Sequence, residues 1–399
     1  MGNTKSTYYG FFKENEAEEL GSLYSEMGFE AVVSKIKEKN EALEKETLSI
    51  AVTGESGTGK SALVNAMRGL NPGEPGAAEE GTTEQTMKVT RYKHPKLETV
   101  CFYDLPGIGT LNFPARDYAK MVNLNTYDLF IIVIGNRFLE HDALLIREIQ
   151  KMKKQFYFVR SKIDFEFNNL KHQNRENDWQ KEFDKIRDDC IRNLNKSGFS
   201  SQEVFLVSSR FIKDFDFPRF CDILESQLSE NKRYIFQLSL PNFSADVVRK
   251  KKAILHRKIL AAAAASFVAG ASPIPGVSIA CDIAILVKTF LEIRKSFGLD
   301  DDSLGSLALK VGKPVEVLKA EVKNPFISDI TETSVIRVIA GSTAAVAVMA
   351  AEEAAHLIPI VGSVVGAPVS FLTTYGILRN SLDKFEQSAV RVIIKAFEA

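Results

Sequence analysis

Two kinds of segment alternate between residues 48 and 230, and this alternation restricts the possible folds more than any other feature. Short runs rich in β-branched and aromatic residues are predicted as buried strands at 48–52, 100–103, 129–134, 156–160 and 204–207. Longer segments with apolar residues at helical spacing are predicted as helices at 61–67, 114–122, 142–153, 179–194 and 218–228. Parallel strands need crossover helices between them. The pattern therefore predicts an α/β fold with a mostly parallel, doubly wound sheet and helices on both faces.

The two flanks of this region read differently. Residues 13–46 are rich in Glu and Lys, lack Pro, and carry apolar residues at a spacing that predicts two amphipathic helices. Beyond Pro241 the strand pattern fades into a long helical region that is rich in Ala, Val and Leu. At 399 residues the chain exceeds one ordinary domain. We expect an N-terminal segment at 1–46, an α/β domain at 47–235 and an all-α domain at 236–399.

Charge and cysteine content limit the functional classes. Lys plus Arg and Asp plus Glu both total 51, so no excess of positive charge favours nucleic acid as a partner. The 4 cysteines are scattered without metal or redox spacing, as in a reduced cytosolic protein. No secretory signal pattern opens the chain. These features predict a cytoplasmic protein.

A glycine-rich loop connects the first predicted strand to the first predicted helix. Glycines let backbone N–H groups approach a phosphate closely, and the helix N-terminus adds positive potential. The spacing is that of a P-loop, in which Lys60 reaches the β- and γ-phosphates and the Ser61 hydroxyl ligates Mg²⁺. Because it carries that charge, Lys60 is also predicted to be catalytic. The predicted nucleotide-binding residues of this loop are Gly54, Glu55, Ser56, Gly57, Thr58, Gly59, Lys60 and Ser61.

A second motif, Asp104-Leu105-Pro106-Gly107, ends the next apolar run. A carboxylate at Asp104 would hold the water shell of the magnesium ion, and the Gly107 N–H would sense the γ-phosphate. Tight turns use the same residues, but this offset behind a P-loop indicates a nucleotide and Mg²⁺ site.

A third motif selects the base. Asp164 follows the strand at 156–160, and a carboxylate there accepts two N–H bonds from guanine that adenine cannot offer. The stem of Lys162 can lie along the base and ribose. Ser161 stands where the common motif has Asn. After the last strand, Ser208 and Ser209 would supply a backbone N–H to guanine O6. These residues predict GTP and GDP as ligands.

On these motifs the chain resembles the immunity-related (interferon-inducible) GTPases. The most specific stretches are 104–114 and 156–164, with further echoes at 127–132, 216–218 and 297–304. The resemblance runs from about residue 50 to residue 326. The base motif of that family begins with Thr, so Ser161 is a conservative exchange. Lys60 places the chain with members that keep the P-loop lysine rather than those with Met.

The resemblance implies more than the motifs do. It implies a Ras-like domain between an N-terminal helical segment and a C-terminal helical domain. It implies GTP-dependent self-assembly on pathogen-containing vacuoles in cell-autonomous defence. The expected partners are a second copy of the chain, intracellular membranes and related GTPases. The expected location is the cytoplasm, peripherally on those membranes.

The hydrolytic step has no obvious complete set of groups in one molecule. Small GTPases often place Gln after the Asp-x-x-Gly motif to orient water, but here Ile108 follows. We expect slow hydrolysis by the monomer and activation by self-assembly. Glu84 matches a switch glutamate of the family and is the candidate catalytic carboxylate, with a solvated loop residue as the alternative. Thr86, with Thr83 as the alternative, is the predicted switch ligand of Mg²⁺ or the γ-phosphate.

Two apolar stretches, 259–281 and 354–378, leave an alternative open. Each reads as a small-residue helix, a Pro-Gly break and an aliphatic helix. Their length allows a membrane span of about 20 residues, but the breaks predict helices of roughly 10 to 14 residues. Both a packed helical domain and membrane-inserting hairpins fit this pattern.

Three functions are compatible with the sequence. The first is a GTPase that assembles in its GTP state. The second is a nucleotide-locked regulator of related GTPases, against which the intact Lys60 argues. The third is a membrane-embedded protein gated by its nucleotide domain.

The N-terminus begins Met1-Gly2-Asn3-Thr4-Lys5-Ser6, which fits N-myristoylation at Gly2. One myristoyl chain gives only reversible membrane binding, with an association constant on the order of 10⁴ M⁻¹. A second contact is therefore expected. The aromatic residues at 8–12 and the C-terminal segment at 389–397 are the candidates.

Overall fold

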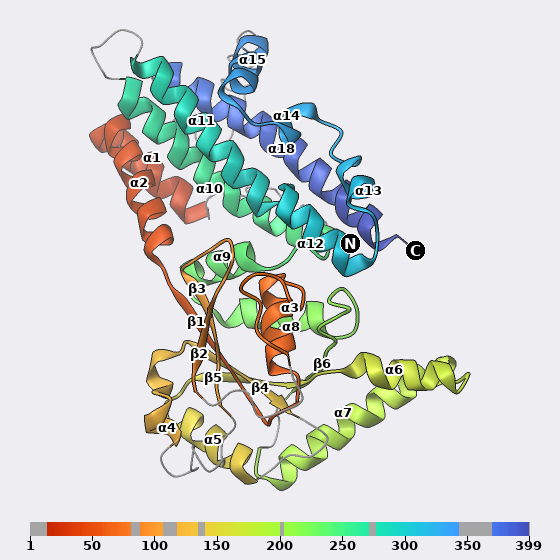
Figure 1. The fold of residues 1–399 in the computed structure, drawn as a ribbon. Helices are drawn as coiled ribbons and strands as arrows, with labels where there is room; N and C mark the ends of the chain where they lie inside the picture. The colour runs from red at the N-terminus through yellow and green to blue at the C-terminus, as the bar shows by residue number, and fades with distance from the viewer. Residues whose placement is uncertain are drawn as a thin grey trace, which may run out of the picture. The chain divides into compact units, whose positions relative to one another are not determined.

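The protein is described by a computed structural model over residues 14–80, 88–106, 118–134, 140–199, 203–270, 277–342 and 369–398 (Figure 1). Contacts divide the chain into two compact units. The first, which we call the α/β unit, runs from Glu46 to Phe243. The second, the helical unit, joins the segment that ends at Lys45 to the chain from Ser244 onward.

A 6-stranded sheet in the order β2-β3-β1-β4-β5-β6 forms the centre of the α/β unit. All neighbours are parallel except β2, which pairs antiparallel with β3 at the edge. The predicted α/β class, a mostly parallel and doubly wound sheet, is confirmed. The strands are β1 (Leu48–Thr53), β2 (Thr90–Lys93), β3 (Val100–Asp104), β4 (Leu129–Ile134), β5 (Gln155–Arg160) and β6 (Val204–Leu206).

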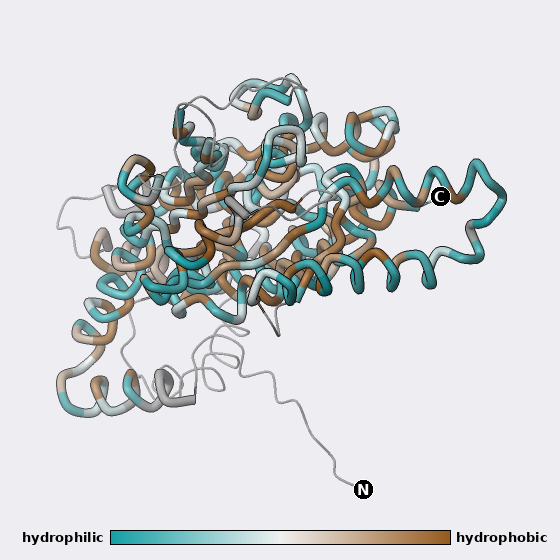
Figure 2. The backbone as a smooth tube through the Cα atoms, turned by 90° about the horizontal axis from the view of Figure 1, so that it is seen from below, coloured by the Kyte–Doolittle hydropathy of each residue, from teal (hydrophilic) through white to brown (hydrophobic). Residues whose placement is uncertain are grey.

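Helices cover both faces of this sheet. One face packs against α4, α5 and α7, and the other against α3, α8 and α9 (Figure 1). The apolar strands run through the interior, while the turn between α6 and α7 is hydrophilic (Figure 2). The helices are α3 (Lys60–Arg68), α4 (Tyr118–Met121), α5 (Glu140–Lys151), α6 (Ile163–His172), α7 (Trp179–Lys196), α8 (Phe217–Gln227) and α9 (Glu230–Ser239). Two short 3₁₀ turns are η1 (Leu124–Thr126) and η2 (Glu176–Asp178).

Strand β2 and helices α6 and α9 were not among the predicted elements. The four residues of β2 alternate half-buried and exposed, because an edge strand contacts the core weakly. Helix α9 buries Ile235 and Phe236 and contacts β1 and β3. The α/β unit therefore extends to Phe243, beyond the expected boundary at residue 235.

The helical unit combines both ends of the chain. Its helices are α1 (Glu14–Met27), α2 (Phe29–Lys45), α10 (Ala245–Gly270), α11 (Val277–Ser296), α12 (Asp301–Val311), α13 (Val315–Lys319), α14 (Pro325–Ser328), α15 (Glu332–Ser342) and α18 (Val369–Phe397). Helix α2 packs on α10, and α10 packs on α18 and α11. Phe29 makes edge contacts with Phe267 and Phe371, at 5.3 and 5.2 Å between ring centroids. These contacts join α1 and α2, which were expected in a separate N-terminal segment, to the helices from α10 onward in one unit.

The helices around the apolar stretches are longer than expected. Helix α10 has 26 residues because the apolar stretch continues a charged helical segment without a break. Helices α11 and α18 have 20 and 29 residues. The expectation of helices of roughly 10 to 14 residues is wrong for these elements. Among the described residues, no helix is both long enough and apolar enough to cross a bilayer.

Polar groups also lie inside the helical unit. The Ser266 hydroxyl on α10 lies 2.5 Å from the Asp282 carboxylate on α11 and 2.6 Å from the Ser370 hydroxyl on α18. Burial, and then the positive charges of Arg379 and Lys252, lowers the pKa of His256 to about 2. The core between the long helices is therefore an apolar one with a few enclosed polar side chains.

Candidate nucleotide site

The glycine-rich loop lies between the end of β1 and the start of α3. Gly54 has φ +139°, and a Cβ at this position would lie 2.1 Å from the Val133 carbonyl oxygen. Gly59 has φ +93°, and its Cβ would lie 2.8 Å from the Ser161 hydroxyl oxygen. Both positions require glycine because the backbone conformation and the close neighbours exclude a side chain. The loop therefore keeps its shape through packing against β4 and the base motif.

Lys60 begins α3 and crosses back over the loop. Its Nζ donates a hydrogen bond to the Glu55 carbonyl oxygen at 2.9 Å, and the side chain is only 6% exposed. The Thr58 hydroxyl donates to the same carbonyl at 2.9 Å. The loop is thus folded around the ammonium group, and Ser56 and Gly57 lie exposed at its crest. A buried ammonium beside a helix N-terminus favours an anion at this position.

Ser61 and Asp104 meet beneath the loop. The Ser61 hydroxyl donates a hydrogen bond to Asp104 Oδ2 at 2.9 Å. Asp104 ends β3 and is almost completely buried. A hydroxyl and a carboxylate are hard oxygen ligands of the kind that Mg²⁺ prefers, so this pair fits a magnesium ion beside a bound phosphate.

The base motif is tied directly to the glycine-rich loop. The Ser161 hydroxyl, buried at the end of β5, donates a hydrogen bond to the Thr58 carbonyl oxygen. The Lys162 ammonium donates to the Gly57 carbonyl oxygen at 2.7 Å. Since both bonds come from the motif and end on the loop, they hold the two segments side by side. A hydroxyl at position 161 is sufficient for this bond, which agrees with the exchange of Thr for Ser.

Asp164 lies in the first turn of α6. Lys162 caps this helix in the left-handed conformation, with φ 60°, and the chain then turns so that Asp164 is 9% exposed. A left-handed Lys is unusual for a residue with a side chain, and such backbone strain is concentrated at functional sites. Asp164 is therefore largely shielded from solvent.

Ser208 and Ser209 follow β6, as predicted. Ser208 is fully buried, and its hydroxyl accepts hydrogen bonds from the N–H groups of Arg210 and Phe211 at 3.2 and 3.1 Å. The Ile163 N–H donates to the Val207 carbonyl oxygen at 3.3 Å and joins this segment to the base motif. The hydroxyl of Ser208 is thus engaged within the turn, and the backbone contact to guanine O6 stays a prediction.

The structure brings the loop, Asp104, the base motif and Ser208–Ser209 to the carboxyl ends of the strands. Four predicted site residues lie outside the described residues: Gly2, Glu84, Thr86 and Gly107. Thr83 and Ile108 also lie outside. The lipidation site, the catalytic carboxylate and the switch contacts remain predictions from the sequence.

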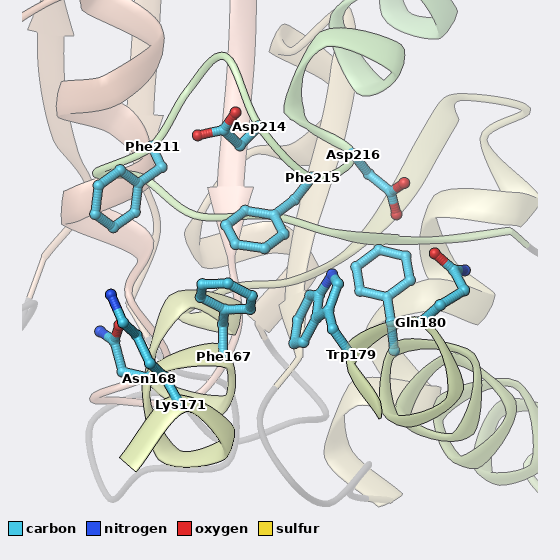
Figure 3. Close-up of a pocket in the computed structure, with 10 residues that line it drawn as sticks. Phe167, Asn168, Lys171, Trp179, Gln180, Phe211, Asp214, Phe215 and Asp216 are labelled. Carbon is cyan, nitrogen blue, oxygen red and sulfur yellow. The ribbon is translucent and has the colours of Figure 1, made fainter. Parts of the chain in front are cut away.

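An aromatic pocket beside this site was not foreseen. It encloses about 570 Å³ between α6, α7 and the loop before α8 (Figure 3). Its lining includes the rings of Phe167, Trp179, Phe183, Phe211 and Phe215. These residues are distant in sequence and have no common motif. The only available signal was that Trp179 is the single Trp of the chain.

The chain thus combines the strand order β2-β3-β1-β4-β5-β6 with the glycine-rich loop, the Ser61–Asp104 hydrogen bond and the segment at 161–164 that contacts this loop. The chain belongs to the interferon-inducible GTPase (IIGP) family, whose pattern it matches over residues 15–360. The family resemblance is thereby confirmed.

Several relatives agree with this assignment. The chain is 35% identical to "Interferon-inducible GTPase 5" of Rattus norvegicus, covering 96% of this chain and 83% of that protein. It is 38% identical to "Interferon-gamma-inducible GTPase 10" of Mus musculus, over 77% of this chain and 73% of that protein. It is 35% identical to "Interferon-inducible GTPase 1" of Mus musculus, over 76% of this chain and 74% of that protein. A solved structure of S. thermophilus NFeoB with GDP·AlF4⁻ aligns at 16% identity and TM-score 0.28, over 73% of this chain and 96% of that one.

Proposed function

We propose that this chain binds GTP and GDP with Mg²⁺ and hydrolyses GTP. The observation that carries the proposal is the pair of hydrogen bonds from Ser161 and Lys162 to the carbonyl oxygens of the glycine-rich loop. These bonds hold the segment that carries Asp164 against the glycine-rich loop in a member of a GTPase family, which supports the proposal that one ligand contacts both. A nucleotide that spans base and phosphate would contact both segments at once.

The site residues divide by the part of the ligand that they would meet. Lys60 and the loop N–H groups would bind the β- and γ-phosphates. Ser61 and Asp104, with Thr86, would hold Mg²⁺, which would neutralise charge on the phosphates. Asp164 would accept guanine N–H groups, while Lys162 would cover the base. Gly107 would sense the γ-phosphate, and the backbone of Ser208–Ser209 would meet guanine O6.

We further propose that hydrolysis is slow in the monomer and rises with self-assembly. Ile108 cannot position water, so a group from a second copy would complete the site, with Glu84 as the candidate carboxylate. Turnover per molecule should therefore rise as protein concentration passes through the micromolar range. Phosphate release across a concentration series tests this.

The possible results of the phosphate-release series distinguish the proposed functions from one another. A rate per molecule that stays flat would contradict activation by assembly and indicate a catalytic group within one molecule. Tight GTP binding without measurable turnover would contradict the enzyme and support the nucleotide-locked regulator. No nucleotide binding would overturn the proposed function as a whole.

We also propose peripheral attachment to intracellular membranes, in cell-autonomous defence against vacuolar pathogens. This proposal rests on the myristoylation pattern at Gly2 and on the family to which the chain belongs. A single lipid binds weakly, but assembly joins several anchors and increases the total affinity. Related GTPases are further expected partners.

The attachment is tested by flotation with vesicles in the GDP and GTP states. The unmodified chain should bind weakly with GDP and firmly with GTP. Gly2→Ala should abolish the first and weaken the second. A Gly2→Ala variant that floats as well as the wild type in both states would rule out the lipid anchor.

A further inference from the structure

Three aromatic rings join the two segments predicted to bind the base. Phe167 lies on α6, Trp179 begins α7, and Phe215 lies in the loop before α8 (Figure 3). Their ring centroids are 5.0 Å apart for Phe167 and Trp179, 5.4 Å for Trp179 and Phe215, and 6.2 Å for Phe167 and Phe215. All three pairs have edge-to-face geometry, which is a favoured arrangement. We call these three residues the aromatic bracket.

The aromatic bracket connects α6 to the loop before α8. The other ends of these two segments hold Asp164 and Ser208–Ser209, which are proposed to contact the base. Phe167 lies one turn after Asp164 on the same helix. Phe215 closes the loop that Ser208 opens. Near the base site the same two segments are joined by the hydrogen bond from the Ile163 N–H to the Val207 carbonyl oxygen at 3.3 Å. The segments are therefore fixed to each other at two separated places.

The backbone at Phe215 is held in an unfavourable conformation. Its φ is 56°, in the left-handed region that bulky side chains rarely occupy. The next residue, Asp216, accepts a hydrogen bond from the Leu206 N–H at 2.8 Å and pairs with Arg187 at 2.9 Å. Arg187 in turn donates to the Val204 carbonyl oxygen at 2.7 Å. This conformation turns the ring of Phe215 toward α6 and α7 while the carboxylate of Asp216 stays fixed to β6.

Strain of this kind persists only where the surroundings enforce it, and it is concentrated at functional sites. Burial alone does not explain it, since Phe215 is only half-buried. What the strained conformation achieves is the contact between the loop and α6. The three rings of the bracket also line the aromatic pocket of about 570 Å³ (Figure 3).

We propose that Phe215 is a positioning residue for guanine selection. By holding the loop against Phe167 and Trp179, it sets the position of the Ser208–Ser209 backbone relative to the Asp164 carboxylate. This inference rests on the proposed function, because it assumes that both segments contact the base. Phe215 is not itself proposed to contact the nucleotide and acts through the two segments that are.

The test compares affinities for GTP and for ITP, which lacks the 2-amino group that Asp164 would bind. Phe215→Gly removes the ring at a position where glycine adopts the observed φ without cost. The GTP:ITP affinity ratio should fall about tenfold, as expected when one charge-assisted hydrogen bond loses its alignment. Phe215→Tyr keeps the ring and should keep the ratio within twofold. General loss of folded protein would lower both affinities equally and leave the ratio unchanged.

A matched control separates positioning from loosening of the fold. Phe156 on β5 is also half-buried and also makes an edge contact, with Phe158 at 5.6 Å, but it is not part of the aromatic bracket. Phe156→Ala should leave the ratio within twofold. Emission from the single Trp, Trp179, reports independently that Phe215→Gly has opened the bracket. If Phe215→Gly does not fold, Phe167→Leu opens the bracket from α6 and should give the same fall.

Two results would overturn the inference alone. One is an unchanged GTP:ITP ratio in a Phe215→Gly protein whose Trp179 emission has shifted. The other is an equal fall in the ratio for Phe156→Ala. A wild-type chain that binds neither nucleotide would overturn the proposed function, and this inference with it.

Discussion

The two units of the molecule depend on different kinds of contact. In the α/β unit, the candidate site is built from short polar bonds at the ends of strands, such as Ser161 to Thr58 and Ser61 to Asp104. In the helical unit, helices meet through apolar rings, such as Phe290 on α11, Phe326 on the short α14 and Phe385 on α18. The first arrangement fixes a few atoms for a ligand. The second mainly buries apolar surface.

The difference shows in what a sequence can reveal. A strand-end contact can also join distant residues, as Ser161 and Thr58 are, but each partner lies in a short motif that the sequence displays. A helix-packing contact joins residues far apart, as Phe29 and Phe371 are. Function is therefore readable from motifs in the α/β unit, whereas the helical unit shows itself only in three dimensions. If this contrast is right, substitutions in the two units should change different measured quantities.

The largest expected effect is on stability, from the centre of the helical unit. Phe385 is fully buried on α18 between Phe290 and Phe326. Phe385→Ala leaves a cavity and should lower the free energy of unfolding by about 3–5 kcal/mol in urea titrations. GTP affinity of the folded variant should stay within twofold. Leu309→Ala, at a side chain 68% exposed on α12, is the control and should change stability by less than about 0.5 kcal/mol. A tenfold loss of GTP affinity in Phe385→Ala would contradict the contrast.

The next effect is on binding, from the α/β unit. Lys60→Ala removes the ammonium group that would meet the β- and γ-phosphates, and should weaken GTP binding about 100-fold and abolish turnover. Lys93→Ala, on the edge strand β2, removes an exposed ammonium and should bind GTP as the wild type does. Equilibrium titration measures both. Wild-type affinity in Lys60→Ala would show that Lys60 does not meet phosphate.

Much of the α/β unit could be predicted because its core strands are short apolar runs with motifs at their ends. The exceptions have physical causes. Thr90–Lys93 lies at an edge and buries only alternate residues weakly, so it lacks the signal of a central strand. Phe165 on α6 is exposed, which weakens the apolar periodicity of that helix. Phe215 has a positive φ and its ring contacts Phe167 on α6 and Trp179 on α7, and nothing local in the sequence indicates either feature.

The helical unit was predictable as helical but not in its arrangement. The apolar residues of α10 from Ile259 to Ala264 favoured both a packed core and a membrane hairpin. In the structure, Leu260, Ala263 and Ala264 pack against α2 and α18. That contact joins residues from opposite ends of the chain, and no local pattern specifies such a pairing.

A smaller effect than those of Phe385→Ala and Lys60→Ala is expected in the pH dependence of the free energy of unfolding. His256 has a pKa of about 2 in the folded chain because burial disfavours its charged form, whereas an unfolded chain would protonate it near 6.5. Its contribution to stability is thus fully present above pH 6.5 and is lost below it at about 1.4 kcal/mol per pH unit. At pH 5 the loss should reach about 2 kcal/mol. His256→Leu should remove this part of the pH dependence in urea titrations between pH 5 and 7. Identical slopes for the two proteins would contradict a neutral, buried His256.

The smallest effect concerns a surface pair of the helical unit. Glu19 on α1 accepts a hydrogen bond from Lys39 on α2 at 2.9 Å, and this bond lowers the pKa of Glu19. Both side chains are partly exposed, so Glu19→Gln should cost less than about 1 kcal/mol, and less still at high salt. A larger, salt-independent loss would show that polar surface contacts matter more to this unit than its apolar rings suggest.

The most direct test of the central claim, that the α/β unit selects guanine through Asp164, is an equilibrium titration of Asp164→Asn with GTP and XTP. The 2-oxo group of xanthine accepts a hydrogen bond from an amide, whereas a carboxylate accepts hydrogen bonds from guanine N–H groups. The wild type should prefer GTP, and Asp164→Asn should lose GTP affinity and shift toward XTP. An Asp164→Asn protein that still prefers GTP over XTP by the wild-type margin would contradict the claim.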